Sequence, residues 1–68
     1  MPQNDALETE MSHLWDEGNL LLLTFPFPFD AAAAMEPRLR DYAQRARAAN
    51  RPFSARMLER LATILRLK

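Results

Sequence analysis

The first apolar residues of the chain recur at the spacing of an amphipathic helix over residues about 5–17. Asp5 and Glu8 are spaced as a capping box with Asp in the first position, which places the start of this helix near residue 5. Gly18 followed by Asn19 predicts its end, because glycine readily adopts the left-handed conformation that closes many helices. The apolar residues stand at i, i+4, i+7 and i+8 and share one face: Leu7, Met11, Leu14 and Trp15.

The middle of the chain predicts a second helix over residues 31–49. Asp30 precedes a run of alanines and is a suitable cap for it. Pro37 interrupts this run, because its ring conflicts with the carbonyl four residues earlier, so we expect either a kinked helix or a new start at Pro37. Beyond Pro37 the helix has a narrow apolar face, formed by Leu39, Tyr42, Ala43, Ala46 and Ala49. The small alanines of this face allow a neighbouring helix to approach closely.

The last part of the chain predicts a third helix over residues 53–67 with the widest apolar stripe of the sequence. The break before it is predicted at residues 50–52, which end in a proline. Ser54 is a candidate cap, with Phe53 placed to pack as a hydrophobic staple against Leu58. The stripe consists of Met57, Leu58, Leu61, Ile64 and Leu65. The sequence therefore predicts an all-α protein of three helices.

Between the first two predicted helices lies an uncharged apolar segment, residues 20–29, which we call the strap. Pro26 and Pro28 remove two backbone donors and favour extended geometry for the residues before them, so we expect a stretched connector. Residues 20–24 fit either a strand or a helix. The strap must line the core, form a subunit interface or bind a partner, because a soluble chain seldom exposes so large an apolar patch.

The length and composition indicate one small domain, residues 1–68, that needs support beyond its own core. No cysteine is present and His13 is the single histidine, so we expect no disulfide, no metal site and no cofactor. Oligomerisation remains as a source of stability, and a homodimer is expected. The first residues are acidic rather than basic and no uncharged run reaches about 18 residues, so we expect neither a secretory signal nor a membrane span, and a cytoplasmic protein.

Charge is strongly segregated along the chain. Residues 1–37 contain seven acids and no bases, and residues 38–68 contain nine bases and two acids, so the two parts carry −7 and +7. This arrangement fits an acidic helix packed on basic ones, within a subunit or across a dimer. It equally offers a basic surface to an acidic partner.

The sequence gives little support for catalysis, and we expect no enzyme. His13 has Glu10 and Glu17 at helical spacing, which is most often an arrangement of solvated surface residues. A chain with a single glycine has no glycine-rich phosphate loop.

A small dimeric DNA-binding regulator is an alternative function. The basic second and third helices, joined by a short turn, match a helix-turn-helix in outline. Its candidate nucleic-acid contacts are Arg51, Arg56 and Arg60. The seven acids of residues 1–37 would oppose phosphate contact.

The preferred interpretation is a small non-enzymatic protein-binding regulator, inhibitor or adaptor, of the kind that phages and mobile elements encode. Phenylalanines that alternate with prolines form a stiff segment, which loses less entropy when it docks. The expected partner is a protein with an acidic or apolar surface, and an accessory structural subunit of a larger complex is a further alternative. The candidate partner-binding residues are Trp15, Leu22, Phe25, Phe27, Phe29, Arg40 and Arg47.

Overall fold

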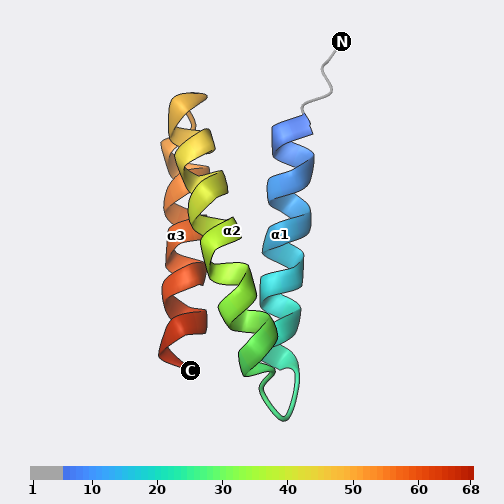
Figure 1. The fold of residues 1–68 in the computed structure, drawn as a ribbon. Coiled ribbons are helices and arrows are strands. Elements are labelled where there is room, and N and C mark those ends of the chain that lie inside the picture. The colour runs from blue at the N-terminus through green and yellow to red at the C-terminus, as the bar shows by residue number, and fades with distance from the viewer. Residues whose placement is uncertain (1–5) are drawn as a thin grey trace.

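The computed structural model describes residues 6–68 and shows three helices packed side by side, with no strand in that part of the chain (Figure 1). They are α1 (Ala6–Leu23), α2 (Phe29–Ala48) and α3 (Pro52–Leu67). Successive helices run in opposite directions, and the bundle measures 42 × 19 × 16 Å. The predicted all-α, three-helix class is confirmed. None of the described helices has the length and apolar character needed to cross a membrane.

The predicted end of the first helix at Gly18 is wrong, because α1 continues to Leu23. Gly18 is buried inside the helix, and a Cβ built on it would stand 2.5 Å from the Leu61 Cδ2 atom. A side chain at this position would press on the buried Leu61 of α3, so the glycine leaves room for it. Leucine is a good helix former, and the following leucines extend α1. Asp5 of the predicted capping box lies outside the described residues.

The predicted extended strap over residues 20–29 is too long, and the non-helical connection is confined to residues 24–28. The second helix begins at Phe29 rather than at residue 31 or at Pro37. Pro37 lies inside α2, which passes through it without a new start. Because Pro37 has no N–H, the Ala33 carbonyl lacks its helical hydrogen-bond donor. Both residues are exposed, so water can donate to that carbonyl.

A Schellman motif closes α2 at the predicted break. Asn50 has a φ of 65°, and its N–H donates to the Arg47 carbonyl while the Arg51 N–H donates to the Ala46 carbonyl at 2.7 Å. Asparagine is one of the few residues other than glycine that tolerate this left-handed conformation. The new helix then starts with Pro52 at its first position.

Two expected details of the start of α3 are wrong. Arg51, not Ser54, occupies the N-cap position, and no side chain caps the helix. Phe53 is not a staple against Leu58, because it lies within α3 with its side chain 72% exposed.

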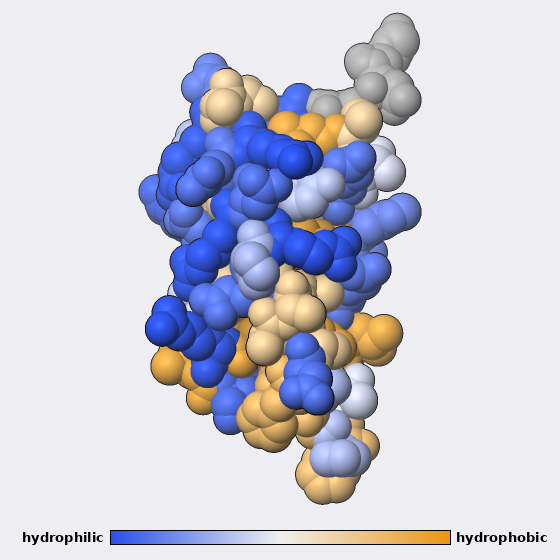
Figure 2. Space-filling view, in the orientation of Figure 1, coloured by the Kyte–Doolittle hydropathy of each residue, from blue (hydrophilic) through white to orange (hydrophobic). Residues whose placement is uncertain are grey.

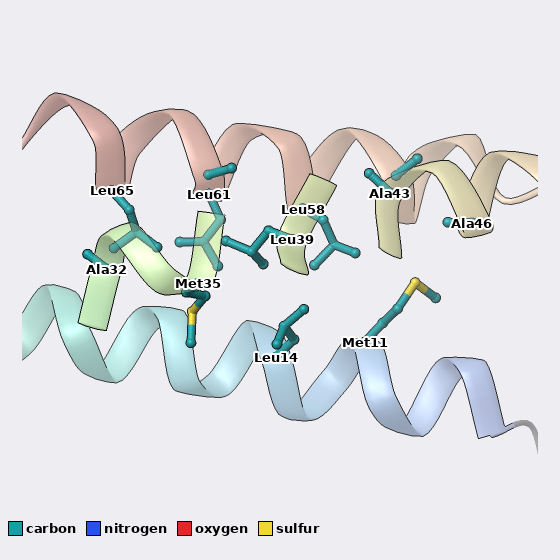
Figure 3. Packing of buried hydrophobic residues seen from close by; sticks show 12 residues of the cluster. Met11, Leu14, Ala32, Met35, Leu39, Ala43, Ala46, Leu58, Leu61 and Leu65 are labelled. Atoms are coloured by element: carbon teal, nitrogen blue, oxygen red, sulfur yellow. The ribbon is translucent and has the colours of Figure 1, made fainter. Parts of the chain in front are cut away.

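The core runs along the bundle axis between the three helices (Figure 3). Leu39 of α2 and Leu61 of α3 are its most completely buried large side chains. α2 and α3 form the closest pair, and four fully buried alanines line them: Ala43, Ala46, Ala55 and Ala62. The predicted approach through small residues is thus observed, although Ala49 lies beyond α2 and is exposed.

Candidate protein-binding surfaces

Large apolar side chains are exposed where α1 passes into α2, at the lower end of the molecule in Figure 2. We call this surface the apolar tip, formed by Leu20, Leu23, Phe25 and Phe29. Phe25 is 95% exposed and Leu23 is 82% exposed. The end of α1 and the connection therefore present apolar groups directly to solvent.

The tip is held in place by residues of the strap that face inward. Phe27 and Leu22 are half-buried and pack against the core cluster. The Phe27 ring meets the Phe29 ring edge to face, with centroids 4.9 Å apart and an angle of 79° between planes. Phe27 and Leu22 therefore anchor the connection, while Phe25 and Phe29 remain available. Four residues of the strap were predicted to bind a partner. Leu22 and Phe27 face the core, whereas Phe25 and Phe29 are exposed.

Trp15, the remaining apolar residue predicted to bind a partner, lies in a different place. It is half-buried on α1 and lines an open groove of about 470 Å³ against α3. We call this the α1–α3 groove, lined by Trp15, Phe53, Arg56, Met57, Arg60, Leu61 and Ile64. A smaller hollow of about 210 Å³ shares Trp15 and Met57 with it. Neither Phe53 nor Ile64 was predicted to lie on the surface, because Ile64 falls in the apolar stripe of the third helix and Phe53 was predicted to be a staple against Leu58.

Most arginines are engaged with carboxylates of the same chain. Arg40 contacts Glu36 at 3.2 Å, and Arg47 binds Glu59 through both terminal nitrogens. The two arginines predicted to face a partner are therefore already paired. Three further pairs, at distances from 3.1 to 4.0 Å, join Arg45 to Asp41, Arg66 to Glu36 and Arg38 to Glu17.

The pair between Arg47 and Glu59 links α2 to α3 and shifts both groups. Its hydrogen bonds lower the pKa of Glu59 and raise the pKa of Arg47. Both side chains are well exposed, so solvent screening keeps the contribution of this pair to stability small.

The acidic first helix meets the basic part of the chain within one subunit. Arg51, a predicted nucleic-acid contact, binds Glu8 at 2.9 Å. The Tyr42 hydroxyl donates to Glu10 at 2.6 Å. The segregated charges of the sequence therefore serve, at least in part, to hold α1 against its neighbours.

His13, which the sequence predicted to be a solvated surface residue beside Glu10 and Glu17, lines a polar hollow of about 170 Å³. Glu10, Glu17 and Tyr42 also line it. The hydrogen bond to Glu10 raises the pKa of Tyr42, which moves this phenol further from ionisation near neutral pH. The hollow is thus a shallow arrangement of surface groups in which the tyrosine is not activated as a base.

Within residues 6–68 no group of three or more His, Cys, Asp or Glu side chains is placed to hold a metal ion. The fold and its surfaces define a small three-helix bundle with an exposed apolar tip and an apolar groove flanked by arginines. Comparisons with protein-family models, curated proteins and solved structures find no match.

Proposed function

We propose that this protein is a small non-enzymatic regulator or adaptor whose apolar tip is a protein-binding surface. The observation that carries the proposal is the exposure of four large apolar side chains, Leu20, Leu23, Phe25 and Phe29, over the end of α1, the connection and the start of α2. A scattered exposed leucine needs no explanation, whereas a group of large apolar side chains is typical of an interaction site.

The size of the tip supports this function. An aromatic side chain carries roughly 200 Å² of surface, so Phe25 and Phe29 together expose about 300 Å² at the fractions observed. This is already comparable with the largest apolar patch of an ordinary monomer, which is about 300–600 Å². The two leucines enlarge it further. Covering this area by a partner provides a hydrophobic driving force for association.

The partner we propose for the tip in the purified protein is a second copy of this chain. Two tips that meet about a twofold axis would hide each other's apolar groups, as an isologous interface requires. A domain of this size has a limited core of its own, and dimerisation is a common source of additional stability for such small chains.

The test compares wild type with a Leu23→Ser/Phe25→Ser variant by analytical ultracentrifugation over a range of protein concentrations. Both residues are exposed, so circular dichroism should show the same helix content in each. We expect wild type to dimerise and the variant to remain monomeric. The control is Phe53→Ser, which removes another exposed phenylalanine away from the tip and should dimerise as wild type does.

A wild-type protein that stays monomeric at every concentration would contradict self-association through the tip. A photocrosslinking amino acid at position 25 then tests for a different protein partner in the cell of origin. If position 25 forms no crosslink, or if Leu23→Ser leaves the crosslink unchanged, the proposal that the tip binds a protein is contradicted.

A further inference from the structure

We propose that the α1–α3 groove binds an acidic amphipathic helix of a partner protein, with two carboxylates held by Arg56 and Arg60. This second binding surface is separate from the apolar tip. Neither arginine has a carboxylate partner within residues 6–68, and apolar side chains line the groove together with them.

The groove exposes apolar groups that the bundle itself does not cover. Phe53 is 72% exposed and Ile64 is 38% exposed, and both line the groove with the half-buried Trp15. Phe53 and Ile64 mark a length of about 16 Å along α3 at 1.5 Å per residue. A helix of about three turns matches this length, and apolar side chains at i, i+3, i+4 and i+7 would fill the groove as helix-in-groove complexes do.

Arg56 and Arg60 differ from the other arginines of the chain. Six of the eight arginines pair with a carboxylate of the described residues, whereas neither of these two does so within residues 6–68. Both are exposed and both line the groove. Because they stand at i and i+4 on α3, their like charges lie one turn apart and repel each other. Two carboxylates at the same helical spacing on a partner would match them in position and sign.

The occupant is not the acidic first helix of a second copy of this chain. Met11 and Leu14, which form much of the apolar face of α1, are buried in its own core. An acidic helix with a free apolar face must therefore come from another protein.

A nucleic acid fits the groove less well. Only two arginines line it that have no carboxylate partner within residues 6–68, which is few for contacts along a phosphate backbone. Ile64 and Met57 contribute aliphatic surface that a sugar–phosphate backbone does not use.

The experiment uses the full chain as bait for a phage-displayed library of helical peptides that have a fixed leucine stripe and randomised flanking positions. Selected peptides are titrated while the fluorescence of Trp15, the single tryptophan of the chain, reports occupation of the groove. Each peptide is compared with a version in which Glu is replaced by Gln. Single-stranded and duplex DNA oligonucleotides are titrated in the same way.

We expect the library to enrich acidic residues spaced four apart, with a change in Trp15 emission on binding. The Arg56→Gln/Arg60→Gln variant and the Gln peptides should each bind about tenfold more weakly, as two partly exposed ion pairs allow. The matched control is Arg45→Gln/Arg66→Gln, which removes two exposed arginines that do not line the groove and should leave affinity unchanged.

Three outcomes would overturn the proposal. The first is selection of no peptide, or of peptides without acidic residues. The second is equal affinity of wild type and Arg56→Gln/Arg60→Gln for the selected peptides. The third is tighter binding of DNA through the same two arginines, with affinity that falls steeply as salt rises. The Leu23→Ser/Phe25→Ser variant should bind the peptides as wild type does, so failure of the groove and failure of the tip are distinguished.

Discussion

At the scale of single residues, the structural role of Gly18 depends on a contact with a residue far away in the sequence, Leu61. In sequence it resembles a helix terminator, since glycine tolerates the left-handed conformation at the end of a helix. In the structure it continues α1 and leaves room for the buried Leu61 side chain. Asn50 is the opposite case, because its left-handed backbone follows from local chemistry and the sequence indicated the break there. Local signals are therefore reliable where the cause is local.

Replacement Gly18→Ala should destabilise the protein by about 1 kcal/mol, although alanine is the better helix former by roughly that amount. The reason is that overpacking a core costs about 1–3 kcal/mol, and the added Cβ meets Leu61, which is only 1% exposed. Chemical denaturation measures the change in the free energy of unfolding. In a Leu61→Ala background the same replacement should become stabilising, and equal effects in both backgrounds would show that the contact with Leu61 is not the cause.

At the scale of elements, the closest pairing in the molecule is between α2 and α3, which meet along a row of buried alanines. Ala43 and Ala46 of α2 face the same interface as Ala55 and Ala62 of α3. Small side chains let two backbones approach closely, so the pair tolerates little added volume. The helical period indicated this alanine face, because residues 43 and 46 lie on the same side of a helix as Leu39.

The variant Ala46→Leu should therefore lower the free energy of unfolding by at least about 1–3 kcal/mol. Its control is Ala34→Leu, which introduces the same side chain at an exposed position of the same helix and should change stability by less than about 0.5 kcal/mol. Thermal unfolding followed by circular dichroism is a suitable measurement. Similar melting temperatures for the two variants would contradict the close packing described here.

At the scale of the whole molecule, α1 is attached more loosely than the other two helices are to each other. It buries three residues, whereas α2 and α3 bury five each. Exposed polar contacts add to its attachment, among them Arg51 to Glu8 and Arg38 to Glu17. Such exposed pairs contribute little individually and are screened by salt. The proposed α1–α3 groove and apolar tip both include residues of this loosely held helix.

Amide hydrogen exchange should accordingly show earlier opening of α1 than of α2 and α3, because local stability follows buried contacts. Peptides from residues 6–23 should exchange faster at low salt and faster still in about 1 M salt, where the Debye length is about 3 Å. Peptides from the α2–α3 pair should respond much less to salt. Uniform protection across the three helices, unaffected by salt, would argue that the bundle opens as a single unit.

Local patterns in the sequence predicted the helical class, the approximate bounds of α3 and the break between α2 and α3. These features depend on periodicity, on proline and on the conformational preference of Asn50, which act over a few residues. Of the residues that line the candidate sites, the sequence predicted Trp15, Phe25 and Phe29 but not Phe53 or Ile64.

The packing of the three helices sets which of those residues remain accessible. Gly18 lies inside α1 with the Leu61 side chain of α3 against it, and Phe27 turns inward while Phe25 is exposed. Arg40 and Arg47 find carboxylates in the fold, whereas Arg56 and Arg60 do not within the described chain. Accessibility and the pair of Arg47 with Glu59 depend on contacts between residues far apart in the chain, whereas the pair of Arg40 with Glu36 follows from the i, i+4 spacing of one helix.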